Sequence, residues 1–91
     1  MQVIRYDIGY RNRGELVEIT LSSIANVRLM DYPNLGSYEN GRQYYYYGGL
    51  ANRSQVRLQI PGSGHWYVIV DMKGLDGSVL SSVHVLPGPL P

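Results

Sequence analysis

The sequence predicts an all-β fold, a small antiparallel β-sandwich with a jelly-roll-like arrangement of about seven strands. Apolar and polar residues alternate at a period of two from one end of the chain to the other, which is the pattern of half-buried strands. Gly, Pro, Asn and Asp interrupt this alternation at short intervals. No window shows the period of an amphipathic helix, so we expect no helix.

The first half of the chain contains an expected strand at residues 2–8 and two further alternating stretches. Their apolar rows are Val17, Ile19 and Leu21 in one stretch and Ala25, Val27 and Leu29 in the next. The short connection at residues 22–24 keeps both rows on one face of a sheet. We therefore expect the two stretches to pair as a β-hairpin.

Residues 31–41 are expected to form the longest loop, because Pro, Asn, Gly and Ser dominate their composition. A loop of this length in so small a domain is expected to carry function or to cross between sheets. A strand with four consecutive tyrosines is expected to follow it, over residues 42–47.

The second half repeats the strand pattern around a break at residues 61–64, Pro-Gly-Ser-Gly. A tight hairpin at this break would mismatch the apolar row that begins at Trp66, unless His65 joins the loop. We favour a crossing to the opposing sheet at this point. A turn at residues 73–77 is then expected to lead into a last hairpin strand, residues 79–85. The Pro-rich tail, residues 87–91, cannot enter a ladder and is expected to lie extended.

The bulk composition indicates one soluble domain over residues 1–91, because half of this length could not enclose a core. Cysteine is absent, which excludes disulfides, thiolate metal sites and thiol nucleophiles. The N-terminal segment has no uninterrupted apolar stretch, so we expect neither a signal peptide nor a membrane span. The expected location is the cytoplasm.

The charged and aromatic residues narrow the classes of partner. The net charge of +1 is far below what non-specific nucleic-acid binding needs, so we do not expect a nucleic-acid partner. Lys73 is the only lysine beside seven arginines, and arginine is suited to forked hydrogen bonds and to stacking on rings. Nine tyrosines and no phenylalanine predict that several aromatic rings stay at the surface.

The four adjacent tyrosines, residues 44–47, are the most unusual feature of the sequence. Successive side chains of a strand point to opposite faces, so at most two of the four can join the core. One interpretation is a stacking platform for a sugar, a base or a partner protein. The other is an outward pair that covers a sheet edge or packs under the 31–41 loop, with Tyr32 and Tyr38 completing a small cluster. The predicted binding residues are Tyr38, Arg42, Tyr44, Tyr45, Tyr46, Tyr47 and Arg53.

His65 and His84 are the only histidines, and a last hairpin centred near Gly74 would place them opposite each other. Two imidazoles do not complete a metal site, which needs three or four ligands, and we expect no metal or cofactor. No serine lies in an elbow motif. An enzyme, such as a small hydrolase with His65 or His84 as its general base, therefore ranks last among the functions that we consider.

Three segments of the chain carry a resemblance to a known family: residues 25–31, Tyr47-Gly-Gly, and Pro61-x-Ser-Gly-His-Trp-Tyr-Val-x-Val-Asp. On these segments the chain resembles the uncharacterised bacterial family catalogued as domain of unknown function DUF1883. The resemblance extends from the Tyr6-Asp7 region to Leu86-Pro87. Domains of this kind stand alone or beside a TIR-type signalling domain, which implies a role in recognition or assembly and supplies no activity.

From the sequence we therefore expect a non-catalytic module that binds an unknown protein or small ligand through exposed Tyr and Arg side chains. The alternative is a structural subunit whose tyrosine strand lies at a sheet edge and pairs with itself in a homo-oligomer. Light scattering distinguishes the two, because a strict monomer at high concentration excludes self-assembly.

Overall fold

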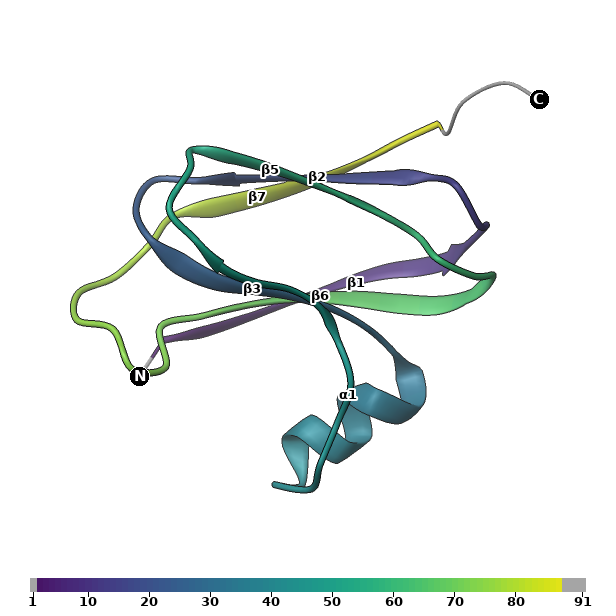
Figure 1. Cartoon of the computed structure of the whole chain (residues 1–91), viewed down its shortest axis with the longest axis horizontal. Helices are drawn as coiled ribbons and strands as arrows, with labels where there is room; N and C mark the ends of the chain where they lie inside the picture. Colours follow the sequence, from purple (N-terminus) through teal and green to yellow (C-terminus); the bar gives the residue numbers. More distant parts are fainter. Residues whose placement is uncertain (1, 88–91) are drawn as a thin grey trace.

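The computed structural model, which describes residues 2–87, contains two antiparallel sheets packed face to face and one helix, α1 (Tyr32–Glu39), outside them (Figure 1). The larger sheet has the strand order β1-β6-β3-β4, and the smaller sheet has the order β5-β2-β7. This confirms the predicted all-β sandwich. The strands are β1 (Val3–Arg11), β2 (Leu16–Leu21), β3 (Ala25–Asp31), β4 (Tyr47–Ala51), β5 (Gln55–Gln59), β6 (Gly64–Asp71) and β7 (Ser81–Leu86).

The main core lies between the two sheets and consists of the apolar rows that alternate along the strands. Ile19 of β2, Leu29 of β3 and Val68 of β6 are fully buried there. Each buried side chain of this size stabilises the fold by about 1.5–3 kcal/mol. β6 is buried on both faces, because α1 covers the outer face of its sheet and encloses a second cluster with Leu35 and Ile69 (Figure 1).

The predicted hairpin of β2 and β3 is wrong. β2 lies at the centre of the smaller sheet and β3 lies in the larger sheet, so residues 22–24 form an arch across the core. The two apolar rows therefore do not lie on one face of a single sheet, but they face each other across the gap between the sheets and share one core. Strand pairing and packing across a core bury the same alternating face, and the sequence pattern does not distinguish them.

The break at residues 61–64 does carry the chain to the opposite sheet, as predicted, since β5 and β6 belong to different sheets. The hairpin predicted at residues 73–77 is wrong for the same reason as the first. β7 pairs with β2 in the smaller sheet, so residues 72–80 form another crossing between the sheets, in which Val79 is buried. In the part of the predicted tail that the structure describes, Pro87 follows β7 outside any strand; the other tail residues lie outside the described range.

The predicted loop at residues 31–41 is mostly the helix α1. Asp31 caps its N-terminus, with Oδ1 accepting a hydrogen bond of 3.2 Å from the backbone N of Asn34, and Pro33 lies in the first turn. Asn40 caps the C-terminus, and Gly41 follows in the left-handed region at φ 70°. Caps rather than an apolar period begin and end this helix, whose one buried residue is Leu35.

The predicted tyrosine strand is also shifted. Residues 42–46 have no regular secondary structure, and β4 begins at Tyr47. At the N-terminus, β1 is longer than expected and contains a bulge between Asp7 and Gly9. Within residues 2–87 no helix has the length and apolar character that a membrane crossing requires.

Candidate functional site

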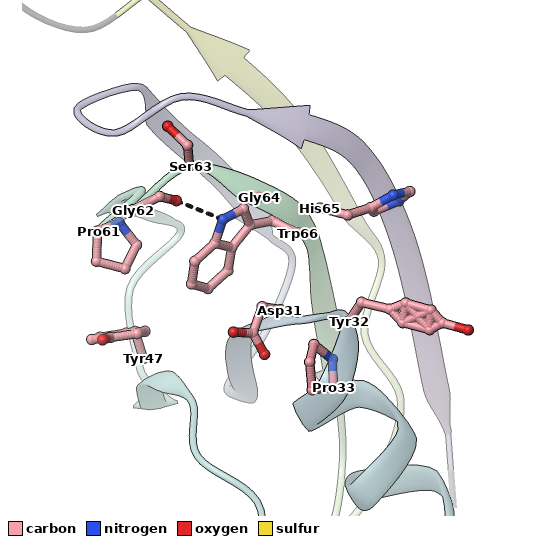
Figure 2. Close-up of a pocket in the computed structure, with 10 residues that line it drawn as sticks. All are labelled: Asp31, Tyr32, Pro33, Tyr47, Pro61, Gly62, Ser63, Gly64, His65 and Trp66. Carbon is pink, nitrogen blue, oxygen red and sulfur yellow. Dashed lines mark hydrogen bonds between the residues drawn. The ribbon is translucent and has the colours of Figure 1, made fainter.

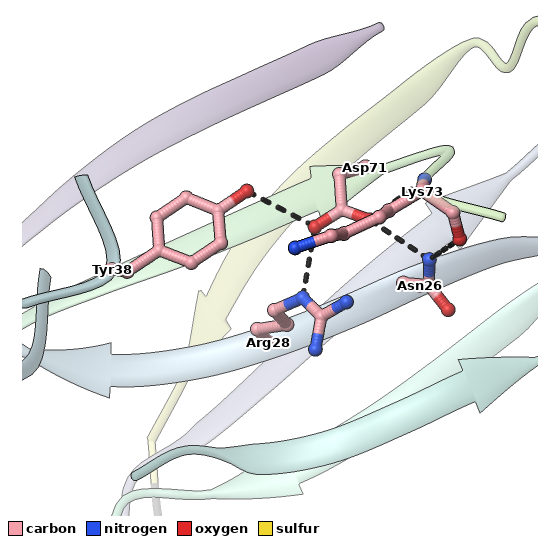
Figure 3. Close-up of polar contacts among 5 residues, drawn as sticks. All are labelled: Asn26, Arg28, Tyr38, Asp71 and Lys73. Atoms are coloured by element: carbon pink, nitrogen blue, oxygen red, sulfur yellow. Dashed lines mark hydrogen bonds and ion pairs between the residues drawn. The ribbon is translucent and has the colours of Figure 1, made fainter. Parts of the chain in front are cut away.

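A buried carboxylate organises the helix-covered face of the larger sheet (Figure 3). Asp71 of β6 is fully buried, and its Oδ2 accepts hydrogen bonds from Arg28 Nε at 2.8 Å and from Tyr38 Oη at 3.1 Å. Its Oδ1 accepts from Asn26 Nδ2 at 2.8 Å and from the backbone N of Lys73 at 3.1 Å. Each carboxylate oxygen therefore accepts two hydrogen bonds. These replace the hydrogen bonds to water that a buried charge loses.

The pKa values in this cluster follow from those contacts. Burial alone would raise the pKa of Asp71, but the hydrogen bonds from Arg28 and Asn26 hold it below the usual value of 3.8. Burial and the Asp71 charge together raise the pKa of Tyr38 to about 12. Asp71 is thus an anion and Tyr38 a hydrogen-bond donor at neutral pH, and the cluster ties α1 to the sheet.

Three tyrosines continue from this cluster toward the surface. The rings of Tyr38 and Tyr44 meet edge to face with centroids 5.1 Å apart, and Tyr44 lies 5.6 Å from Tyr46. The guanidinium carbon of Arg28 lies 4.9 Å from the centroid of the Tyr46 ring, a cation–π contact. Tyr38 and Tyr44, both predicted as binding residues, are therefore half-buried members of a packed cluster.

The other three tyrosines of the tract, Tyr45, Tyr46 and Tyr47, are exposed, and of these only Tyr47 belongs to a strand. The exposed fractions are 72% for Tyr45, 39% for Tyr46 and 53% for Tyr47. The backbone N of Tyr45 donates a hydrogen bond of 2.8 Å to Asn34 Oδ1, which attaches this segment to the start of α1. Three adjacent aromatic rings thus face solvent on a segment that is held in place.

The two predicted arginines lie apart from each other. Arg42 is exposed and borders an open depression of 510 Å³ that Tyr38 and Tyr44 also line. Arg53 is exposed in the connection between β4 and β5 and borders a different pocket, of 290 Å³, whose other lining residues were not predicted. The residues predicted from sequence therefore do not form one continuous surface.

A further pocket, which we call the end pocket, lies where the arch at residues 61–63 meets the starts of α1, β4 and β6 (Figure 2). It is open to solvent and has a volume of 390 Å³. Of the predicted binding residues, Tyr47 alone lines this pocket. The full lining is Asp31, Tyr32, Pro33, Tyr47, Pro61, Gly62, Ser63, Gly64, His65 and Trp66.

An indole ring at a fixed angle forms the back of the end pocket. Trp66 Nε1 donates a hydrogen bond of 2.9 Å to the carbonyl oxygen of Gly62, which holds the ring in place. The Trp66 and Tyr47 rings have centroids 6.2 Å apart and planes tilted by 56°. In Figure 2 these two rings and the Asp31 carboxylate border the same central space, whereas Tyr32 and His65 point away at the rim.

Sequence reasoning missed the end pocket because its residues had other expected roles. The prediction that Trp66 belongs to the apolar row of its strand is correct, since its side chain is only 6% exposed. Asp31 and Pro33 belong to the segment for which the sequence predicts a loop. The one local signal was the Pro-Gly-Ser-Gly break beside a tryptophan, which leaves an aromatic ring at the end of a strand next to an open arch.

The two histidines lie in different sheets, so the prediction that they are opposite each other is wrong. His65 Nε2 lies 2.6 Å from Asp7 Oδ1, and this hydrogen bond lowers the pKa of Asp7. His84 pairs in register with Glu18 on the smaller sheet. In residues 2–87 no hydrogen bond joins a serine hydroxyl to either histidine, and no three His, Asp or Glu side chains are grouped to hold a metal ion.

Comparison with known proteins adds one relationship. Residues 1–89 match the family described as domain of unknown function (DUF1883). No curated protein and no solved structure matches the chain.

Proposed function

Since the chain belongs to the DUF1883 family, whose description assigns no activity, we propose its function from its geometry: a non-catalytic binding module. The observation that carries the proposal is the exposure of Tyr45, Tyr46 and Tyr47 on a segment that is hydrogen-bonded to α1 and borders the end pocket. Exposed aromatic rings beside a concave site are typical of binding surfaces, because rings bury a large area at little cost in side-chain entropy.

The polar groups near the pocket favour binding over catalysis. The Asp31 carboxylate caps α1, and the His65 imidazole is hydrogen-bonded to Asp7. A hydrolase would need a nucleophile within hydrogen-bond reach of a base, and Ser63 makes no such bond with His65 among the described residues. Asp71, the buried carboxylate, has all its acceptor positions engaged by protein donors.

The test begins with a thermal-shift screen of the wild-type protein against sugars, nucleotides, metal salts and short peptides, because a ligand that binds the folded state raises its Tm. The double variant Tyr45→Ser/Tyr47→Ser is then compared with wild type for each ligand found. We expect the variant to keep its far-UV circular dichroism spectrum and to lose the ligand-induced shift.

Leu80→Ser is the matched control, since Leu80 is also an exposed large apolar residue but adjoins the opposite end of β2 from the end pocket. It should bind as wild type does. A double tyrosine variant that folds and retains the full ligand-induced shift would refute the proposal.

A second candidate function, self-association, rests on the edge strand β4. Its five residues include no charged side chain and no proline, and Leu50 is 66% exposed. The other edge of the same sheet, β1, is protected by a bulge and by the charged side chains of Arg5 and Asp7. A β4 pair between two copies would extend the larger sheet.

Light scattering at high protein concentration tests this candidate. A dimer that Leu50→Lys dissociates supports it, whereas a strict monomer excludes it.

As for location, the lack of cysteine favours a reducing compartment, and we propose the cytoplasm.

A further inference from the structure

One carboxylate lines the end pocket, and hydrogen bonds within the described part of the protein engage only one of its two oxygens. Asp31 is the only acidic residue in the lining, and no Lys or Arg lines the pocket. Its Oδ1 accepts hydrogen bonds from the backbone N of Asn34 at 3.2 Å and from Asn34 Nδ2 at 2.7 Å. Within residues 2–87 no hydrogen bond or ion pair engages Oδ2. One carboxylate oxygen is therefore available to a donor that enters the pocket.

The aromatic walls favour the same kind of ligand. The Trp66 and Tyr47 rings are tilted by 56°, so they form a corner rather than a flat platform. Ring faces carry the negative part of the aromatic quadrupole, and they attract a cation that approaches them. Pro33 and Pro61 add uncharged sides. An anionic ligand would meet Asp31 without any Lys or Arg side chain in the lining to offset it.

From this juxtaposition we infer that the end pocket binds the cationic side chain of an arginine or lysine on a partner protein. The inference rests on the proposed binding function and specifies its ligand. The charged head lies beside Asp31 Oδ2, and its aliphatic stem lies along the rings of Trp66 and Tyr47. The open mouth of the pocket admits a side chain that reaches in from a separate backbone.

The sole tryptophan supplies the readout, because its ring lines the site. Trp66 fluorescence is titrated with four peptides, acetyl-Gly-Xaa-Gly-amide with Xaa being arginine, lysine, citrulline or norleucine. Citrulline and norleucine are neutral counterparts of the two basic residues. We expect saturable binding of the arginine or the lysine peptide, at least tenfold tighter than its neutral counterpart and weakened by salt.

Asp31→Asn isolates the charge, because asparagine keeps the Oδ1 acceptor that caps α1 and is as good a capping residue. It should lower the affinity for the basic peptide at least tenfold with an unchanged Tm. Asp76→Asn, the same change at an exposed residue in the connection between β6 and β7, should have no effect.

Equal binding of the neutral peptides, no binding of any peptide, or full affinity in Asp31→Asn would overturn the inference. None of these outcomes bears on the tyrosine double variant. The proposed binding function fails only if that variant retains its ligand.

Discussion

At the scale of single residues, the buried carboxylate of Asp71 joins several parts of the fold through hydrogen bonds. A fully buried carboxylate is stable only when donors replace the water that it has lost, and here the donors come from β3, from α1 and from the chain that follows β6. The Tyr38 contact spans residues that are 33 positions apart in the sequence. One carboxylate thus connects the helix to two neighbouring strands.

We predict that Asp71→Asn lowers the free energy of unfolding by about 3 kcal/mol, because Arg28, whose side chain is only 11% exposed, loses its ionic partner. Urea unfolding measures the change. Glu18→Gln, which breaks the more exposed ion pair with Arg57, is the control and should cost less than about 1 kcal/mol. Similar decreases in the free energy of unfolding in the two variants would show that the buried ion pair stabilises the fold no more than the exposed one.

At the scale of elements, β4 packs closely against β3 and requires a glycine where the two meet. Gly48 has φ +121°, and a Cβ atom at this position would lie 2.2 Å from the carbonyl oxygen of Val27. The atom in the way is backbone, so it cannot rotate aside. Gly49 has a similar φ of +146°, but a Cβ there would meet nothing within 4 Å.

We predict that Gly48→Ala destabilises the protein by about 2 kcal/mol more than Gly49→Ala, since both carry the strain of a positive φ and only the first adds a clash. Thermal or urea unfolding of the two variants gives the difference directly. Because β4 begins at Tyr47, Gly48→Ala should also change the environment of that ring. Equal stability of the two variants would contradict the close approach.

At the scale of the whole molecule, the lowered pKa of Asp71 links stability to pH. The folded protein holds this carboxyl below the value of 3.8 that it has when unfolded, so the unfolded state binds the proton more readily. The contribution of Asp71 is therefore present above pH 3.8 and is lost as the pH falls through the lower folded pKa. Asp7 acts in the same direction, through its hydrogen bond with His65.

We predict that the free energy of unfolding changes little between pH 7 and pH 5 and falls below pH 3.8. The difference in stability between wild type and Asp71→Asn should shrink in the same acidic range, because protonation removes the charge that the variant lacks. Urea unfolding of both proteins at pH 6 and at pH 2.5 measures this. A difference that stays constant would mean that Asp71 remains ionised or contributes no charge effect.

The sequence by itself determined which face of each strand is apolar, that the strands form a sandwich, and that several adjacent tyrosines face solvent. These properties are local: side-chain direction alternates along an extended chain, and a buried row must be apolar. The exposure of Tyr45, Tyr46 and Tyr47 agrees with the prediction from tyrosine composition and does not follow from alternation, because most of the tract lies outside a strand.

Only the tertiary structure decided which sheet each strand joins, that α1 forms, and that the end pocket exists. An apolar row is buried equally well beside a neighbouring strand or across the core from it, so alternation left the positions of β3 and β7 open. The short helix α1 is held by the Tyr38–Asp71 hydrogen bond and by burial of Leu35 against the sheet. Such contacts join residues that are distant in the chain, so a local sequence pattern does not predict them.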